Sequence, residues 1–198
     1  MNAAKGHPEA EAEAAARAEA PVFPPIRKSV TVSAPPEKAF HRFTAEMASW
    51  WPLASHSVGQ RDAETIVMEG REGGRIVERI RGGRECVWGT VTAWEPPRRV
   101  AFTWHPGDDP ARAQDVEVRF TAEGTSTTRV ELEHSGFERL GALARRAHRG
   151  YPLGWVYVLG RFAGKRGPFM AFITVMTATM MGVMRAKARL TREKSSAA

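Results

Sequence analysis

Between Thr65 and His134 the chain is divided by glycine and proline into short segments of strand-forming residues. The breaks contain Gly73-Gly74, Gly82-Gly83, Pro96-Pro97 and Pro106-Gly107. Short strands joined by such tight turns are typical of hairpins in one antiparallel sheet. The predicted strands are Thr65–Glu69, Arg75–Ile80, Cys86–Trp94, Arg99–Trp104, Asp115–Thr121 and Arg129–His134.

Alternation within the last two segments predicts which side chains face the core. Val116, Val118 and Phe120 alternate with Glu117 and Arg119. Val130, Leu132 and His134 alternate in the same way with arginine and glutamate. Each strand therefore has one buried and one solvated face. A further strand is predicted at Ile26–Val32, which gives a sheet of six to seven strands.

Helical periodicity appears on both sides of this strand region. Pro36 fits a first helical position, and Ala39, Phe40, Phe43 and Met47 recur at helical spacing after it. After Gly136, the residues Tyr151, Trp155, Val158, Leu159 and Phe162 share one helical face, with Pro152 expected in the first turn and Leu140–His148 as a second helical stretch. The prediction is an α+β fold in which a curved sheet covers a long C-terminal helix.

The two ends of the chain differ from this central region in composition. Residues 1–25 are rich in alanine and glutamate and end in a proline linker, which predicts a disordered tail. The formal net charge of +7 is concentrated at the other end, because residues 137–198 hold 12 basic and 2 acidic side chains. We expect a domain at 26–164, followed by a tail at 165–198.

An uncharged apolar segment within that tail runs from Pro168 to Met184 between basic flanks. We predict a helix from about Phe169 to Arg189, separated from the preceding helix by a break at Gly167-Pro168. The apolar stripe of this helix is long enough that it is expected to be buried against another surface. Docking on the protein itself, a homodimer, or contact with a membrane surface through Phe169 to Met184 would each provide one, and a membrane-spanning helix would be at the short limit.

Several motifs together resemble the SRPBCC (START-like, helix-grip) superfamily. They include Val32-Ser33-Ala34-Pro35-Pro36 entering the first helix, and Trp50-Trp51-Pro52 after it. Segment 89–104, segment 131–137 and the pair Gly154-Trp155, taken to open the last helix, are similar to the branch named for the activator of heat-shock-protein-90 ATPase homologue. The resemblance covers about residues 26–164. It implies a helix-grip fold, but its members range from lipid or polyketide binders to enzymes and chaperone cofactors.

His134 is the most informative candidate residue, because alternation places it on the inward face with Val130 and Leu132. A neutral imidazole there would orient a polar ligand group or act as a general base near pH 7; the alternative is a structural histidine. Trp50 and Trp51 either line a ligand entrance or fill the core, and the facing of Trp88, Phe102 and Trp104 is left open because a one-residue register shift reverses it. The predicted ligand cavity is lined by Trp50, Trp51, Trp88, Phe102, Trp104, His134, Tyr151, Trp155, Leu159 and Phe162.

No catalytic, metal-binding or cofactor-binding motif is found in the sequence. The six histidines lack metal-ligand spacing, Cys86 is the sole cysteine, and Ser135 lacks a nucleophile elbow. No phosphate loop or dinucleotide fingerprint is present. We therefore predict no catalytic residue, no metal, no cofactor and no nucleic-acid partner.

The function that these observations favour is the binding of a small apolar ligand, lipid or polyketide-like, in a cavity between the sheet and the long helix. A cyclase or dehydratase that uses His134 is the enzymatic alternative, and a chaperone ATPase cofactor acting through its surface is a third. A single cysteine and the absence of a secretory signal predict a cytoplasmic protein, with contact at a membrane surface left open by the tail.

Overall fold

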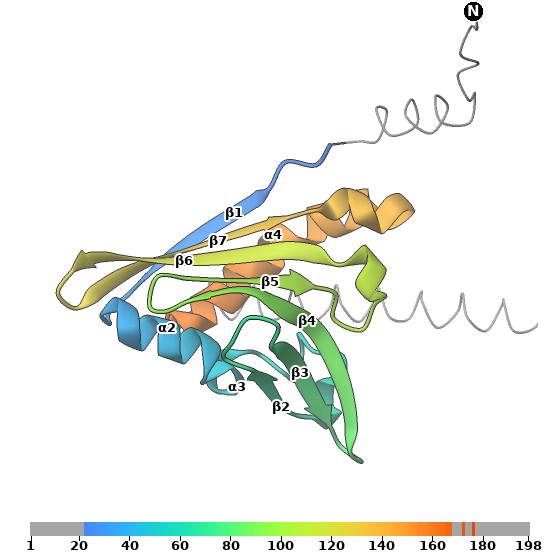
Figure 1. The fold of residues 1–198 in the computed structure, drawn as a ribbon, viewed down its shortest axis with the longest axis horizontal. Coiled ribbons are helices and arrows are strands. Elements are labelled where there is room, and N and C mark those ends of the chain that lie inside the picture. The colour runs from blue at the N-terminus through green and yellow to red at the C-terminus, as the bar shows by residue number, and fades with distance from the viewer. Residues whose placement is uncertain (1–21, 168–171, 173–175, 177–198) are drawn as a thin grey trace, which may run out of the picture.

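The structure is a computed structural model that describes residues 22–167, 172 and 176 (Figure 1). Its strands are β1 (Ile26–Val32), β2 (Ala63–Met68), β3 (Arg75–Ile80), β4 (Arg84–Glu95), β5 (Arg99–Trp104), β6 (Gln114–Gly124) and β7 (Thr127–Ser135). Its α-helices are α2 (Pro36–Thr44), α3 (Met47–Trp50) and α4 (Ala144–Phe162). Short 3-10 helices are η1 (Gln60–Asp62), η2 (Pro110–Arg112) and η3 (Phe137–Leu143).

The strands form one seven-stranded antiparallel sheet in the order β1-β7-β6-β5-β4-β3-β2. Consecutive strands pair as hairpins from β2 to β7, and β1 joins the edge beside β7, with Ile26 opposite His134. The predicted antiparallel sheet is confirmed, and the observed strands contain or closely match the predicted ones. Glycine and proline between the strands favour this hairpin topology because they adopt the backbone conformations that tight turns require.

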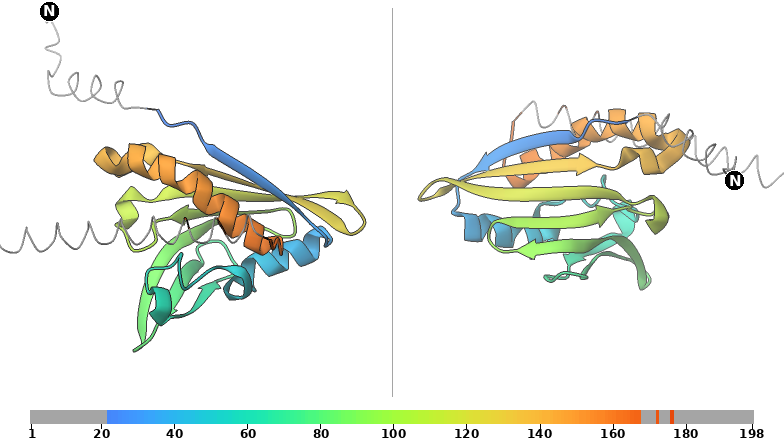
Figure 2. Two further views of the ribbon diagram at one scale, coloured as in Figure 1. Left: turned by 180° about the vertical axis from the view of Figure 1, so that it is seen from behind. Right: turned by 45° about the horizontal axis from the view of Figure 1, so that its top comes forward.

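The long helix α4 lies across one face of the curled sheet, as Figure 2 shows from behind, while α2 and α3 cover one end. Trp155, Val158, Leu159 and Phe162 are buried on its inner face. Phe40 and Phe43 of α2 pack against Phe120 of β6 with ring centroids 5.3 and 5.6 Å apart. The predicted arrangement, a curved sheet that covers a long C-terminal helix, is thus confirmed.

The start of the long helix differs from the prediction. The helix α4 begins at Ala144, so Pro152 lies inside it rather than in its first turn, and Gly154-Trp155 do not open it. Residues 144–149 are alanines, arginines and a histidine, whose helix propensity extends the helix upstream of the proline. An interior proline removes one backbone hydrogen bond, and the burial of the inner face offsets that cost.

Glycines in backbone conformations that other residues rarely adopt precede η3 and follow α4. Gly136 (φ 81°) turns the chain from β7 into η3, and Gly164 (φ 68°) follows the last helical residues.

Ahead of β1, the ring of Phe23 packs on His148, whose Nε2 donates a 2.8 Å hydrogen bond to the Pro24 carbonyl. This contact holds the residues before β1 against α4.

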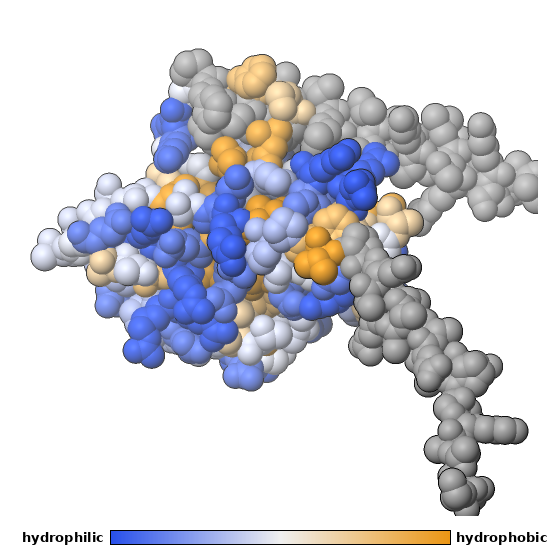
Figure 3. All heavy atoms as spheres, turned by 90° about the horizontal axis from the view of Figure 1, so that it is seen from above, coloured by the Kyte–Doolittle hydropathy of each residue, from blue (hydrophilic) through white to orange (hydrophobic). Residues whose placement is uncertain are grey.

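The predicted tail helix lies outside the described residues, except for Phe172 and Met176, which are helical and exposed. Among the described helices, none is both long and apolar enough to cross a membrane. Viewed from above, hydrophobic residues gather in separate patches among charged side chains (Figure 3).

Candidate functional site

Nine of the ten predicted site residues belong to the hydrophobic core cluster, and the tenth, His134, is a buried polar residue. Tyr151 is partly exposed, and the other nine are buried. Trp88, Phe102 and Trp104 all point inward, which settles the facing that the sequence left open.

The predicted residues separate into two groups. Trp50 and Phe162 pack with Phe43 under α2, with centroid distances of 5.1 to 5.3 Å. Four indoles, here called the indole cluster, meet beside the middle of α4 and touch the first group through Trp50 and Trp51, whose ring centroids are 5.6 Å apart. Trp51 contacts Trp88, Trp104 and Trp155 at 5.3, 5.6 and 6.1 Å. Trp104 also lies 5.7 Å from Trp155.

Most of these indoles have hydrogen-bond partners for their N–H groups. Trp50 donates to the Arg42 carbonyl at 2.8 Å, and Trp51 to the His56 carbonyl at 2.7 Å. Trp155 donates to Nδ1 of His134 at 3.1 Å. Trp104 Nε1 is buried and makes no hydrogen bond of good geometry within the described part of the chain. The bonds of Trp50 and Trp51 fix the chain segment around them, which favours the core-filling interpretation for both.

Glu78 is a buried carboxylate that the sequence analysis missed. It accepts hydrogen bonds from Trp88 Nε1 at 2.9 Å and from the backbone N–H groups of Val58 and Gly59 at 2.9 and 2.8 Å. A Cβ on Gly59 would lie 2.9 Å from the carboxylate, so this close approach requires glycine. The alternation Ile76, Glu78, Ile80 in β3 was the signal that places it inside.

His134 is fully buried at the end of β7, and its ring contacts Phe137 and Tyr151 with centroids 4.4 and 4.5 Å apart. An indole nitrogen can only donate, so Nδ1 of His134 must accept from Trp155. The ring hydrogen therefore sits on Nε2, which has no hydrogen-bond partner in the described structure. The site contains a buried donor without an acceptor.

Burial, together with a smaller effect of the nearby His148, lowers the pKa of His134 to about 3. The imidazole is therefore neutral at physiological pH. Since its Nδ1 lone pair is occupied by Trp155, it has no free basic nitrogen. The expectation that His134 is available as a general base near pH 7 is not supported by this arrangement.

Burial also raises the pKa of Tyr151 to about 12, and the Asp108 carboxylate acts in the same direction. The Trp104 N–H acts on the phenol as a hydrogen-bond donor and opposes this shift. Tyr151 therefore stays a neutral phenol. His134, Trp104 and Tyr151 together present N–H and O–H groups and no charge.

Two surface depressions lie away from this group. One, of about 440 Å³, runs along α2 and includes Phe40, Met68 and Trp94. The other, of about 210 Å³, lies on the outer face of the sheet beside Asp115 and Glu117. Neither borders His134 or Trp155, where aromatic rings fill the interior.

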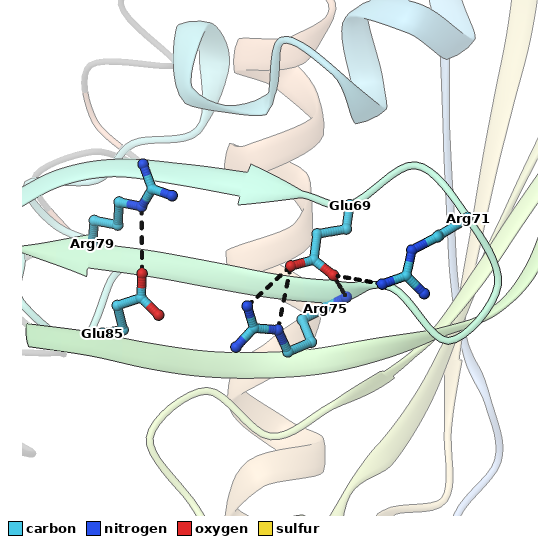
Figure 4. Close-up of polar contacts among 5 residues, drawn as sticks. All are labelled: Glu69, Arg71, Arg75, Arg79 and Glu85. Carbon is cyan, nitrogen blue, oxygen red and sulfur yellow. Dashed lines mark hydrogen bonds and ion pairs between the residues drawn. The ribbon is translucent and has the colours of Figure 1, made fainter.

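The exposed β2–β3 hairpin carries a separate set of ion pairs (Figure 4). Glu69 accepts from the backbone N–H and the guanidinium of Arg75 at 3.0 and 3.1 Å, and these contacts hold its pKa below the usual range. Arg79 pairs with Glu85 across β3 and β4 at 3.5 Å. These pairs are exposed and stabilise the hairpin only modestly.

A curled antiparallel sheet closed by a long C-terminal helix defines the helix-grip class of domains. Residues 33–163 match the sequence profile of the activator of Hsp90 ATPase homolog 1-like proteins. The chain belongs to this family, as the resemblance had indicated. No curated protein sequence matches it significantly.

Solved structures with the same fold include proteins of different activities. An anthrahydroquino-gamma-pyrone synthase, solved in a complex, is 35% identical over 72% of this chain and 97% of its own, with a TM-score of 0.51. A self-sacrificing resistance protein from Micromonospora echinospora is 27% identical over 71% and 92%, with a TM-score of 0.51. An HSP90 activator from Plasmodium falciparum, at 18% identity over 72% and 97% with a TM-score of 0.50, shares the fold alone.

Proposed function

We propose that this domain binds a small, largely apolar ligand between the sheet and α4, beside His134. The observation that carries the proposal is the unpartnered Nε2–H of His134, which is fully buried among aromatic rings. Leaving a buried donor unsatisfied costs about 1–3 kcal/mol, a cost that a bound acceptor would remove. A purely structural histidine would be expected to have both nitrogens paired.

Tyr151 supports a route into this interior. Of the predicted site residues it is the one that remains partly exposed, and its ring lies against His134. A ligand that entered beside Tyr151 would meet Trp155, Trp104 and the His134 ring. Each 100 Å² of apolar ligand surface buried there would contribute about 2.5 kcal/mol to affinity.

A second candidate function is catalysis on an aromatic, polyketide-like substrate. It is favoured by the 35% identity to a synthase. In this arrangement the neutral imidazole and the Trp104 N–H would not remove a proton. They would donate hydrogen bonds to an oxygen that gains negative charge in the transition state. The chaperone-cofactor alternative has only a fold likeness in its support.

Native mass spectrometry of the purified full-length protein tests the binding proposal. We expect additional mass that is lost on denaturation, and less of it in a His134→Leu variant. A Trp94→Phe variant, changed in the groove beside α2, serves as the control and should keep the additional mass. A protein that carries no ligand and is not stabilised by any member of a panel of apolar aromatic compounds would contradict the proposal.

The enzymatic alternative is tested on the same extracted compound. If the domain catalyses a reaction, the compound extracted from the wild-type protein should be the product. The Trp104→Phe variant should then carry a larger share of the precursor of that product. Identical compounds from both proteins would favour binding without conversion.

A further inference from the structure

The arginines at the start of α4 differ from those of the sheet in having no carboxylate partner. On the sheet, for example, Arg27 pairs with Glu133 at 2.8 Å. Arg145, Arg146 and Arg149 are exposed and make no ion pair within the described part of the chain. A first helical turn is stabilised by acidic residues and not by basic ones. The stability of the fold therefore does not explain these three arginines.

No acidic side chain neutralises this group of arginines. The sequence contains no aspartate or glutamate from Arg139 to Arg192. Around the start of α4, Asp115 and Glu138 both act on Arg139, and Asp108 pairs with an arginine of η2. The three positive charges are thus available to an anionic partner outside the chain.

Exposed apolar side chains lie at the same end of the helix. Leu143 is 49% exposed and is three residues from Arg146, so the two share a helix face. Val22 is 92% exposed and precedes Phe23, whose ring centroid lies 5.3 Å from that of His148 in α4. These exposed residues are here called the basic corner: Val22, Leu143, Arg145, Arg146 and Arg149.

The basic corner lies at one end of the domain, where η3 and the start of α4 project past the end of β7 (Figure 1). A flat surface can therefore approach it. It is also close to Tyr151, because the ring of Phe137 lies 5.0 Å from His148 and 5.7 Å from Tyr151.

We propose that the basic corner docks this domain on the surface of a membrane that contains anionic phospholipids. The arginines would pair with the lipid phosphates, while Leu143 and Val22 would enter the apolar boundary beneath them. Each arginine near such a surface contributes about fivefold to the affinity. A nucleic acid would also attract the arginines, but it would leave the two apolar side chains without a partner.

Membrane docking does not depend on the proposed ligand-binding function. If that function holds as well, Tyr151 lies beside the membrane from which an apolar ligand would enter.

The experiment measures co-sedimentation of the full-length protein with two kinds of vesicle. One contains phosphatidylcholine alone, and the other contains phosphatidylcholine and phosphatidylserine in a ratio of about 3:1. We expect binding to the anionic vesicles to be at least roughly tenfold tighter, and to weaken as the salt concentration rises.

Two double variants with the same change of charge locate the contact. Arg146→Gln with Arg149→Gln should weaken binding to the anionic vesicles roughly tenfold. Arg61→Gln with Arg84→Gln changes two exposed arginines beside β2 and at the start of β4, and should bind like the wild type. Circular dichroism and the unfolding midpoint establish that both variants are folded.

A further pair tests the apolar part of the contact. Leu143→Ser should weaken binding to the anionic vesicles several-fold without a change of charge. Val67→Ser, at an exposed position of β2, is the matched control and should have no effect.

The proposal is contradicted by equal binding to the two kinds of vesicle or by equal weakening in the two double variants. Unchanged binding of Leu143→Ser, or tighter binding to an RNA duplex than to the anionic vesicles, would contradict a lipid surface as the partner. None of these results bears on ligand binding, which native mass spectrometry tests separately.

Discussion

Glu78 and His134 are two buried polar side chains of the same sheet, and they differ in how completely their hydrogen bonds are satisfied. Three N–H groups donate to the Glu78 carboxylate, one of them from Trp88. His134 accepts one hydrogen bond from Trp155, and its own Nε2–H has no acceptor in the described structure. The carboxylate with three donors fixes a loop in place, whereas the unsatisfied imidazole N–H is the observation on which the proposal of ligand binding rests.

The comparison also separates two roles of tryptophan. Trp88 donates a hydrogen bond to a carboxylate, while the N–H of Trp104 acts on the neutral phenol of Tyr151. Both are buried and lie 5.4 Å apart, so burial by itself does not distinguish them.

Replacing Trp155 by alanine should have the largest effect, because it removes a buried indole and the donor to His134. We expect a loss of about 3–5 kcal/mol in the free energy of unfolding, measured by urea denaturation. Val156, partly exposed on the same helix, provides the control, and Val156→Ala should cost much less. A loss below about 1 kcal/mol for Trp155→Ala would show that the helix face is misassigned.

The buried imidazole of His134 should make the free energy of unfolding depend on pH. In the unfolded chain a histidine has a pKa near 6.5, and in the folded protein that of His134 is about 3, so the unfolded state binds more protons between these values. The stability that depends on neutral His134 is present above about pH 6.5 and is lost as the pH falls toward 3.

Measured as the difference between pH 7 and pH 4, this loss should be about 3 kcal/mol larger in the wild type than in His134→Leu. The variant His41→Leu, which changes an exposed histidine, should follow the wild type. Parallel curves for wild type and His134→Leu would mean that the imidazole is not held neutral by burial.

Replacing Glu78 by glutamine should cost about 2 kcal/mol, because the amide keeps the shape but brings its own N–H groups against three donors. The exposed Glu64 in β2 is the matched control, and Glu64→Gln should change the free energy of unfolding by less than about 0.5 kcal/mol. Equal effects of the two substitutions would contradict the conclusion that the hydrogen bonds of Glu78 stabilise the fold.

The smallest effect should come from Trp104→Phe, which removes an N–H that has no regular partner. Beyond the loss from burying a smaller ring, the free energy of unfolding should change little. Trp88→Phe makes the same change but leaves Glu78 with one donor fewer, so it should cost about 1–2 kcal/mol more. A larger loss of unfolding free energy for Trp104→Phe than for Trp88→Phe would contradict the roles assigned to these two tryptophans.

Local patterns predicted most of the fold, including the facing of β7 and the inner face of α4. The start of α4 was missed because Pro152 is a strong local signal for a first turn, whereas packing decides the helix here. The facing of Trp88 depends on an irregular register between β3 and β4, where Ile76 pairs with Gly89 and Val77 with Val87. A bulge of this kind has no clear sequence signal.

Sequence patterns predicted that these residues are buried, but not which hydrogen bonds they make. Alternation placed His134 inside, and helical spacing placed Trp155 beside it. The hydrogen bond between them joins residues 21 positions apart and depends on side-chain geometry, which fixes the tautomer. Glu78 was overlooked because a charged residue is usually exposed, and its three donors come from a loop and a neighbouring strand.

The most direct test of this account is the protonation state of His134, observed by nitrogen-15 NMR of the histidine side chains in the full-length protein. The account predicts a neutral ring with its hydrogen on Nε2 from pH 8 to pH 5. The assignment is made with the His134→Leu variant. A ring that is charged at pH 6, or that carries its hydrogen on Nδ1, would contradict it.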